Sequence, residues 1–322
     1  MKLHLDKETF SAAIRTTAQE MGIAAEFVEK DYWICLILQK LSQHPKSNLM
    51  VWKGGTSLSK AYGLIKRFSS DVDFAVLTEG LSQNKQKRLL IHIDKDITSE
   101  LTDIDVPGQT IKNNRFRKTF HAYDSVITQM DSRLGFLGSH VVVELNTYGN
   151  PYPYEQQSIK PFITEMMERH GMTKMIDGLD MKPFAINVLD KRRTLCEKLV
   201  SLLRFSFADD PIQGLTSKIR HLYDLHFLMQ DKDCQVYLQK EFSADLLDLI
   251  AHDKMEFDRP PLWKASDIKT SVLLTDFDNT WAKLSPTYLS ELGALSYSEL
   301  PDESTIAASM RALLSITKTI ID

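Results

Sequence analysis

Apolar and polar residues alternate along the chain in patterns that predict helices, then a sheet, then helices again. Helical spacing covers residues 7–42, and apolar or alternating runs predict strands at 49–52, 72–76 and 141–145. Further helical patterns lie at 81–102, 190–206, 218–230, 242–252 and 303–319. This order predicts an α+β fold in which a small mixed β-sheet is flanked by helices and followed by a mostly helical C-terminal part.

The same order suggests three domains. We expect N-terminal helices over residues 1–48 to pack on a catalytic core at 49–155, followed by a helical C-terminal domain at 156–322. The chain has 322 residues, of which 43% are hydrophobic, so it is long enough to bury a full core.

Charge and cysteine content bear on nucleic-acid binding and on the cellular compartment of the protein. The formal net charge of −4 gives no overall positive field, so nucleic-acid binding would require a local basic patch. The three cysteines, Cys35, Cys196 and Cys234, are far apart, which fits a reducing cytosol. Without an apolar leader or a membrane-length apolar run, we expect a complete cytoplasmic chain and no membrane partner.

Two aspartates and two glycines form the strongest chemical pattern. Asp71 and Asp73 stand two residues apart on a predicted strand, so both side chains lie on one face and can hold Mg²⁺ or Mn²⁺ together. Gly54 and Gly55 precede a predicted helix, and such a turn brings backbone N–H groups to a phosphate. Thr56 and Ser57 would add hydroxyl donors at the same place.

A third acid usually completes such a metal site. Glu144 lies in the strong strand pattern at 141–145 and is the first choice, while Asp103 and Asp105 are the alternatives. The metal ligands expected from the sequence are therefore Asp71, Asp73 and Glu144.

The segment KGGTSLSKAYGLIKRFSSDVDFAV, residues 53–76, resembles the nucleotidyltransferase fold and, more narrowly, the AbiEii/AbiGii toxin family. Residues 29–33 and 219–225 also resemble motifs of that family, with His221 departing from the aspartate that the family often has. The residues of the segment that match the family pattern are Gly54, Gly55, Thr56, Leu58, Arg67, Ser69, Asp71 and Asp73.

The resemblance implies a metal-dependent transfer of a nucleoside monophosphate from a nucleoside triphosphate to an acceptor hydroxyl, such as the 3′ end of a tRNA. It also implies a toxin of a toxin–antitoxin or phage-defence (abortive infection) system, with a cognate antitoxin as partner.

Two downstream residues complete the expected site. Lys198 lies at the edge of the apolar stripe of the helix 190–206, where it could face a triphosphate. Asp224 lies on a helix that is apolar nearly all round, so we expect it to be enclosed and to need a partner. That partner would be Arg220, Lys198 or a substrate group. We expect Lys198 to contact the triphosphate and both residues to serve catalysis.

Two further features allow predictions about regulation and RNA contact. Ser69 fits a turn cap, and a phosphate added there would place negative charge beside the metal acids and disable the site. The segment 112–121 interleaves bases with aromatics, which suits either RNA contact or a solvated strand. Its candidate RNA-binding residues are Lys112, Arg115, Arg117 and Lys118.

The sequence also fits functions of other classes. Arg220 and His226 have the Arg-x(4–6)-His spacing of metal-free helical (HEPN-like) ribonucleases, although that reading leaves the glycine pair and the two aspartates unexplained. A nucleotide-binding protein without transfer activity, or a transferase with a protein acceptor, would use the same first motif.

Overall fold

The structure is a computed structural model that describes residues 1–127 and 132–321 and divides them into two compact units. Unit 1 comprises Met1–Gly63 and Phe68–Leu189. Unit 2 comprises Leu64–Arg67 together with the chain from Asp190 onward. Residues 156–189, assigned above to the C-terminal domain, thus contribute their strands and helices to unit 1.

Unit 1 is built on a mixed sheet, with eight strands in the described part of the chain. The strands follow the order β3-β5-β6-β2-β1-β8-β7, and β4 pairs with β5. At the centre, β2 runs parallel to β6 and antiparallel to β1. The strands are β1 (Met50–Lys53), β2 (Asp71–Val76), β3 (Thr102–Ile104), β4 (Ile111–Lys112), β5 (Phe116–Ala122), β6 (His140–Asn146), β7 (Tyr154–Ile159) and β8 (Phe184–Leu189).

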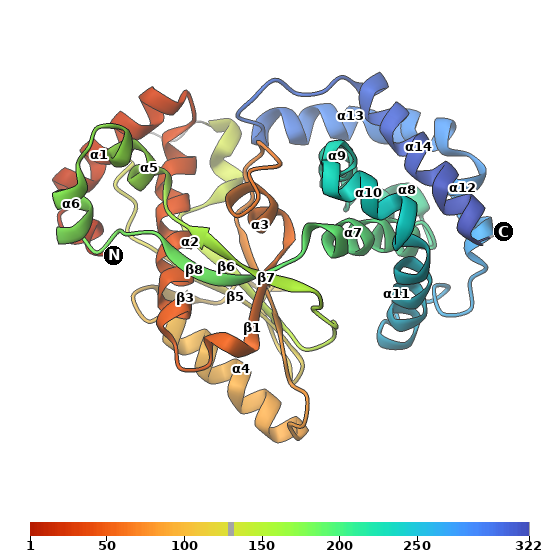
Figure 1. Cartoon of the computed structure of the whole chain (residues 1–322), viewed down its shortest axis with the longest axis horizontal. Coiled ribbons are helices and arrows are strands. Elements are labelled where there is room, and N and C mark those ends of the chain that lie inside the picture. Colours follow the sequence, from red (N-terminus) through yellow and green to blue (C-terminus); the bar gives the residue numbers. More distant parts are fainter. Residues whose placement is uncertain (128–131, 322) are drawn as a thin grey trace. The chain divides into compact units, whose positions relative to one another are not determined.

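Helices cover one face of this sheet, and α2 lies against β6 and β8 (Figure 1). The predicted helix at 81–102 ends early, because α4 stops at Ile97 and Thr102 begins β3. The helices of unit 1 are α1 (Lys7–Met21), α2 (Ala25–Gln43), α3 (Gly54–Lys60), α4 (Gln83–Ile97), α5 (Phe162–Arg169) and α6 (Thr173–Gly178).

The alternation in β2 explains which face is covered. Val72 and Phe74 are fully buried on one face, whereas Asp71 and Asp73 are half-buried on the other. The covered face therefore supplies the core, and the opposite face is left for polar side chains.

Unit 2 is helical, as the sequence predicts. The helices expected at 190–206, 218–230, 242–252 and 303–319 are all present, and the α+β fold class is confirmed. In the described residues no helix is both long and apolar enough to cross a membrane. The helices of unit 2 are α7 (Lys191–Phe205), α8 (Pro211–Thr216), α9 (Ile219–Gln230), α10 (Lys232–Lys240), α11 (Phe242–Glu256), α12 (Val272–Thr275), α13 (Phe277–Leu295) and α14 (Glu303–Ile321).

A buried carboxylate fastens α4 to the sheet. Asp94 on α4 is 4% exposed and accepts hydrogen bonds from the Arg117 guanidinium at 2.8 and 3.0 Å and from the Thr119 hydroxyl at 2.9 Å. Since both donors belong to β5, Asp94 ties α4 to that strand.

Replacing Asp94 with Ala should destabilise the protein by about 3 kcal/mol, because the change leaves the enclosed Arg117 guanidinium without its partner. Asp96→Ala on the same helix is the matched control and should change stability by less than about 0.5 kcal/mol, since Asp96 is 53% exposed. Urea unfolding measures both variants. Equal losses would show that the Asp94 contacts contribute nothing beyond a surface pair.

Candidate active site

The pairing of β2 with β6 brings three carboxylates together on one sheet face. Asp71 lies opposite Val142, and Asp73 lies opposite Glu144. Because side chains directly opposite on neighbouring strands point to the same side, Asp73 and Glu144 are adjacent, with Asp71 on the same face.

The glycine turn lies directly against this cluster. Gly54 has φ +87°, a left-handed conformation that favours glycine, and a Cβ added there would overlap the Asp73 carboxylate oxygen Oδ2. The turn is braced by the helix that it opens, because the Thr56 hydroxyl donates to the Asp71 carbonyl at 2.6 Å and the Ser57 hydroxyl to the Gly54 carbonyl at 2.9 Å. Both hydroxyl protons are thus used within the protein, and a phosphate-binding role for them stays a prediction, as does that for Gly55.

Burial and the negative charges of its neighbours both disfavour the charged form of Asp73. Burial raises the pKa of Asp73 well above its usual range, and the charges of Glu144 and Asp71 raise it further. Two lysines act in the opposite direction. Lys53 lies opposite Asp73 on β1, and the Lys118 ammonium lies 2.8 Å from the Glu144 carboxylate.

The donor set fits a hard divalent cation. All three side chains offer carboxylate oxygens, the ligand type that Mg²⁺ and Mn²⁺ prefer, and a cation would relieve the repulsion around Asp73. Among the described residues no three His, Cys, Asp or Glu side chains already converge as a ready metal site. Asp71 accepts a hydrogen bond from the Ser70 hydroxyl and Glu144 holds Lys118, so binding a metal would require these side chains to turn.

The two alternative third acids lie elsewhere. Asp103 on β3 is exposed, lies opposite His121, and pairs with Lys112 at 3.0 Å. Asp105 is exposed in the loop after β3. Neither residue adjoins β2, because β5 and β6 lie between β3 and β2. Glu144 is therefore the acid that the sheet places beside Asp73.

The predicted pair Lys198 and Asp224 forms part of a buried ionic cluster within unit 2. The fully buried Asp224 carboxylate accepts two hydrogen bonds from the Arg67 guanidinium, at 2.6 and 2.7 Å, and lies 2.7 Å from the Lys198 ammonium. Burial alone would raise the pKa of Asp224, but the charges of Arg67 and Lys198 outweigh it and hold the pKa far below its usual range.

Of the three predicted partners of Asp224, the structure contains Lys198, and Arg67 is a further partner that was not predicted. Arg220 is not the partner, since its guanidinium pairs with Glu291 at 2.5 Å. The spacing of Arg220 within the helix allowed a contact with Asp224, but Arg67 offers two parallel hydrogen bonds from a distant part of the sequence.

The geometry does not support the alternative of a metal-free ribonuclease. Arg220 is committed to Glu291, and both ring nitrogens of His226 are engaged, Nδ1 at 2.7 Å from the Ser309 hydroxyl and Nε2 at 2.8 Å from Gln230. These contacts account for both residues as structural ones.

The four candidate RNA-binding residues do not share one surface. Lys118 and Arg117 are neighbours on β5 and point to opposite faces, Lys118 toward Glu144 and Arg117 toward Asp94. Lys112 pairs with Asp103, and Arg115 stacks its guanidinium over the Tyr148 ring at 4.7 Å. The predicted solvated strand at 112–121 is thus β4 and β5, with Arg117 enclosed.

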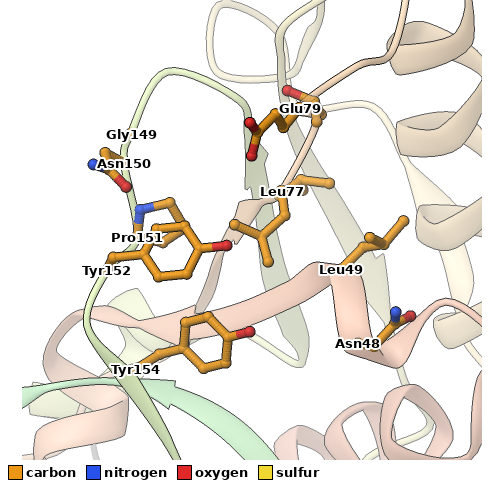
Figure 2. Close-up of a pocket in the computed structure, with 11 residues that line it drawn as sticks. Asn48, Leu49, Leu77, Glu79, Gly149, Asn150, Pro151, Tyr152 and Tyr154 are labelled. Atoms are coloured by element: carbon orange, nitrogen blue, oxygen red, sulfur yellow. The ribbon is translucent and has the colours of Figure 1, made fainter.

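A cavity of about 490 Å³ opens at the other end of β1 and β2 (Figure 2). It is bordered by Leu49 before β1, by Leu77 and Glu79 after β2, and by Tyr152 and Tyr154. Since β2 begins at the aspartate pair and ends at this cavity, the two lie at opposite ends of the strand. None of the predicted site residues lines it.

Three residues of these clusters were not predicted from the sequence as members of the site: Lys53, Lys118 and Arg67. Lys53 immediately precedes the glycine pair and Arg67 belongs to the matched family pattern, so a signal for both was present. Lys118 was predicted to contact RNA because bases and aromatics interleave in residues 112–121. Its pairing with Glu144 depends on the β5–β6 register, which the sequence does not reveal.

Replacing Gly54 with Ala should displace the Asp73 carboxylate and weaken Mn²⁺ binding by about tenfold or more. The matched control is Gly63→Ala, since Gly63 has a similar φ of +62° but no atom within 4 Å of its added Cβ. Electron paramagnetic resonance of free Mn²⁺ measures both affinities. Equal affinities in the two variants would contradict the close approach of Gly54 to Asp73.

Replacing Asp224 with Ala should destabilise unit 2 by about 3–5 kcal/mol, because two buried cations lose their partner. The combined variant Arg67→Met, Lys198→Met and Asp224→Leu should recover most of that stability, since no buried charge remains unpaired. Asp278→Ala, which removes an exposed pair with Arg311, is the control and should cost less than about 0.5 kcal/mol. Urea unfolding measures the stability of all three variants. A loss of stability in Asp224→Ala no larger than in the control would contradict the structural role of the buried ionic cluster.

Comparisons with known proteins identify the family of the chain. A profile of the family described as nucleotidyl transferase AbiEii toxin, type IV toxin–antitoxin system, matches residues 36–306. MenT4, a nucleotidyltransferase toxin from Mycobacterium tuberculosis H37Rv, is similar in structure with a TM-score of 0.50 and 16% identity, over 95% of this chain and 97% of that chain. At this identity, the likeness supports the fold alone. A search of the curated proteins gives no match. The chain belongs to the AbiEii family of nucleotidyltransferase toxins of type IV toxin–antitoxin systems.

Proposed function

We propose that Asp71, Asp73 and Glu144 form the catalytic centre at which a nucleoside monophosphate passes from a nucleoside triphosphate to an acceptor hydroxyl. The observation that carries this proposal is the parallel β2–β6 register, which sets Glu144 beside Asp73 while the Gly54 turn lies against the same carboxylate. Members of nucleotidyltransferase families use a triphosphate and a divalent metal, and this donor set suits Mg²⁺ or Mn²⁺.

Asp71, Asp73 and Glu144 would hold the metal. When bound, the metal neutralises charge on the phosphates of the triphosphate. The lysines of the site, Lys53 and Lys118, add positive charge beside the carboxylates and favour an anionic substrate.

The protein's own groups then serve the transfer. The Gly54 turn offers a close backbone approach to the triphosphate because it carries no side chain. The oxygen of the acceptor hydroxyl forms a bond to the α-phosphorus, and Glu144 accepts the proton that this hydroxyl loses. The bond from that phosphorus to the bridging oxygen breaks, and pyrophosphate leaves with the electron pair.

For the acceptor we propose RNA, with the 3′ end of a tRNA as the specific target, on the strength of the family resemblance. Modification of that end would halt translation, which suits a toxin held in check by a cognate antitoxin. Ser69 stands two residues before Asp71 and is half-buried, so its phosphorylation as an off-switch stays a prediction.

Lys198 is proposed to serve the triphosphate in addition to pairing with Asp224. The stability-matched variant of Arg67, Lys198 and Asp224 separates these roles, because it removes the ions without leaving a buried charge. A folded variant that binds triphosphate like the wild type assigns the cluster to structure alone, whereas a folded variant with at least tenfold weaker binding supports the proposal.

The assay for the central proposal is incubation with Mg²⁺, each α-labelled triphosphate in turn, and total RNA. We expect label in RNA, lost by at least about a hundredfold in Asp73→Asn, because carboxylates that hold catalytic metal cannot be replaced by a neutral amide. Asp103→Asn is the matched control and should transfer at the wild-type rate. Label in a polypeptide would redirect the proposal to a protein acceptor, and no label in any fraction would favour a binding protein.

A further inference from the structure

Three consecutive charged residues near the start of α2 are buried. Glu29, Lys30 and Asp31 are 2%, 1% and 2% exposed. Burial of charge is costly, and apolar side chains of similar size would fill this space at lower cost. The presence of these three charges in the core therefore needs a physical explanation.

The three side chains reach four segments of unit 1, because Asp31 contacts two of them. Successive residues of a helix point about 100° apart, so a triplet fans out around the axis. Glu29 accepts hydrogen bonds from the Ser125 hydroxyl and the Val126 N–H, both at 2.7 Å. These two residues follow β5, the strand that carries Lys118.

Lys30 holds the segment that enters β6. Its ammonium donates to the Leu137 carbonyl at 2.5 Å and approaches the Gly138 carbonyl at 3.4 Å. Burial lowers the pKa of Lys30 to about 8, and the nearby charge of Asp71 opposes that decrease. The charge of Asp71 thus acts on the ammonium, which is itself too enclosed to touch a substrate.

Asp31 holds the helix that begins at the glycine turn. Its carboxylate lies 2.8 Å from the ammonium of Lys60, the last residue of α3, and accepts the Phe162 N–H at 2.7 Å. The Lys60 ammonium also lies 3.9 Å from the centre of the Phe162 ring. The C-terminal end of α3 is thereby fixed to α2.

We propose that Glu29, Lys30 and Asp31 are positioning residues that fix β5, β6 and α3 to one helix, so that Lys118, Glu144 and Gly54 stay aligned around Asp73. This inference rests on the proposed transfer reaction. The triplet acts through other residues and does not contact substrate. Its buried ions are retained because hydrogen bonds and ion pairs fix direction and distance, whereas apolar contacts alone do not.

Lys30→Met tests the proposal, because Met has similar length but neither charge nor donors. We expect kcat for the labelled transfer to fall at least tenfold with KM for the triphosphate changed less than threefold, while the melting temperature stays within a few degrees. Lys40→Met is the matched control, since Lys40 lies on the same helix and pairs with Glu100 instead. It should keep wild-type kcat.

Hydrogen exchange measured by mass spectrometry supplies a readout that does not need activity. In Lys30→Met we expect faster exchange confined to residues 137–146, and in Glu29→Gln a smaller increase confined to the residues around Val126. A fall in melting temperature with kcat per folded molecule unchanged would overturn the proposal, as would unchanged exchange in both variants. If the wild type transfers no label, the proposed reaction fails, while the exchange data still decide whether the triplet positions these segments.

Discussion

The parallel pairing of β2 with β6 is the contact on which the rest of the site depends. It sets Asp73 beside Glu144 with Asp71 on the same face, an arrangement of like charges that is unfavourable without a cation. The surrounding structure holds this arrangement in place. The Gly54 turn lies against Asp73, Lys118 pairs with Glu144, and the covered face of β2 is buried in the core.

Buried ions recur in both units, and in each they join segments that lie far apart in the sequence. In unit 1, Asp31 joins α2 to Lys60 and Asp94 joins α4 to β5. In unit 2, Asp224 joins Arg67 to Lys198. Each cluster is well supplied with hydrogen bonds, which reduces the desolvation cost of its charges. Such contacts contribute geometry more than net stability, as a site built on precise distances requires.

The elements that could be predicted from the sequence are those with a clear local pattern of apolar residues. Helical periodicity located α2, α7, α9, α11 and α14, and strong apolar runs located β1, β2 and β6. The sequence did not reveal β7, since residues 154–159 carry few apolar side chains. The choice of Glu144 over Asp103 agrees with the strand order, while the catalytic role of each residue stays a prediction.

Long-range partners could not be predicted, because they depend on how the elements pack. Arg67 and Asp224 are separated by 157 positions, and nothing in their local sequence identifies the pair. The same holds for Lys118, whose facing residue is set by strand register. The position of Asp224 on a helix that is apolar nearly all round predicted that this carboxylate has a partner, but not that Arg67 is one of its partners.

Anomalous diffraction from crystals grown with Mn²⁺ and a non-hydrolysable triphosphate analogue tests the central claim most directly. The account predicts a manganese peak about 2.2 Å from carboxylate oxygens of Asp71 and Asp73, with the triphosphate against the Gly54 turn. A peak at other ligands, or a triphosphate bound away from these aspartates, would contradict it.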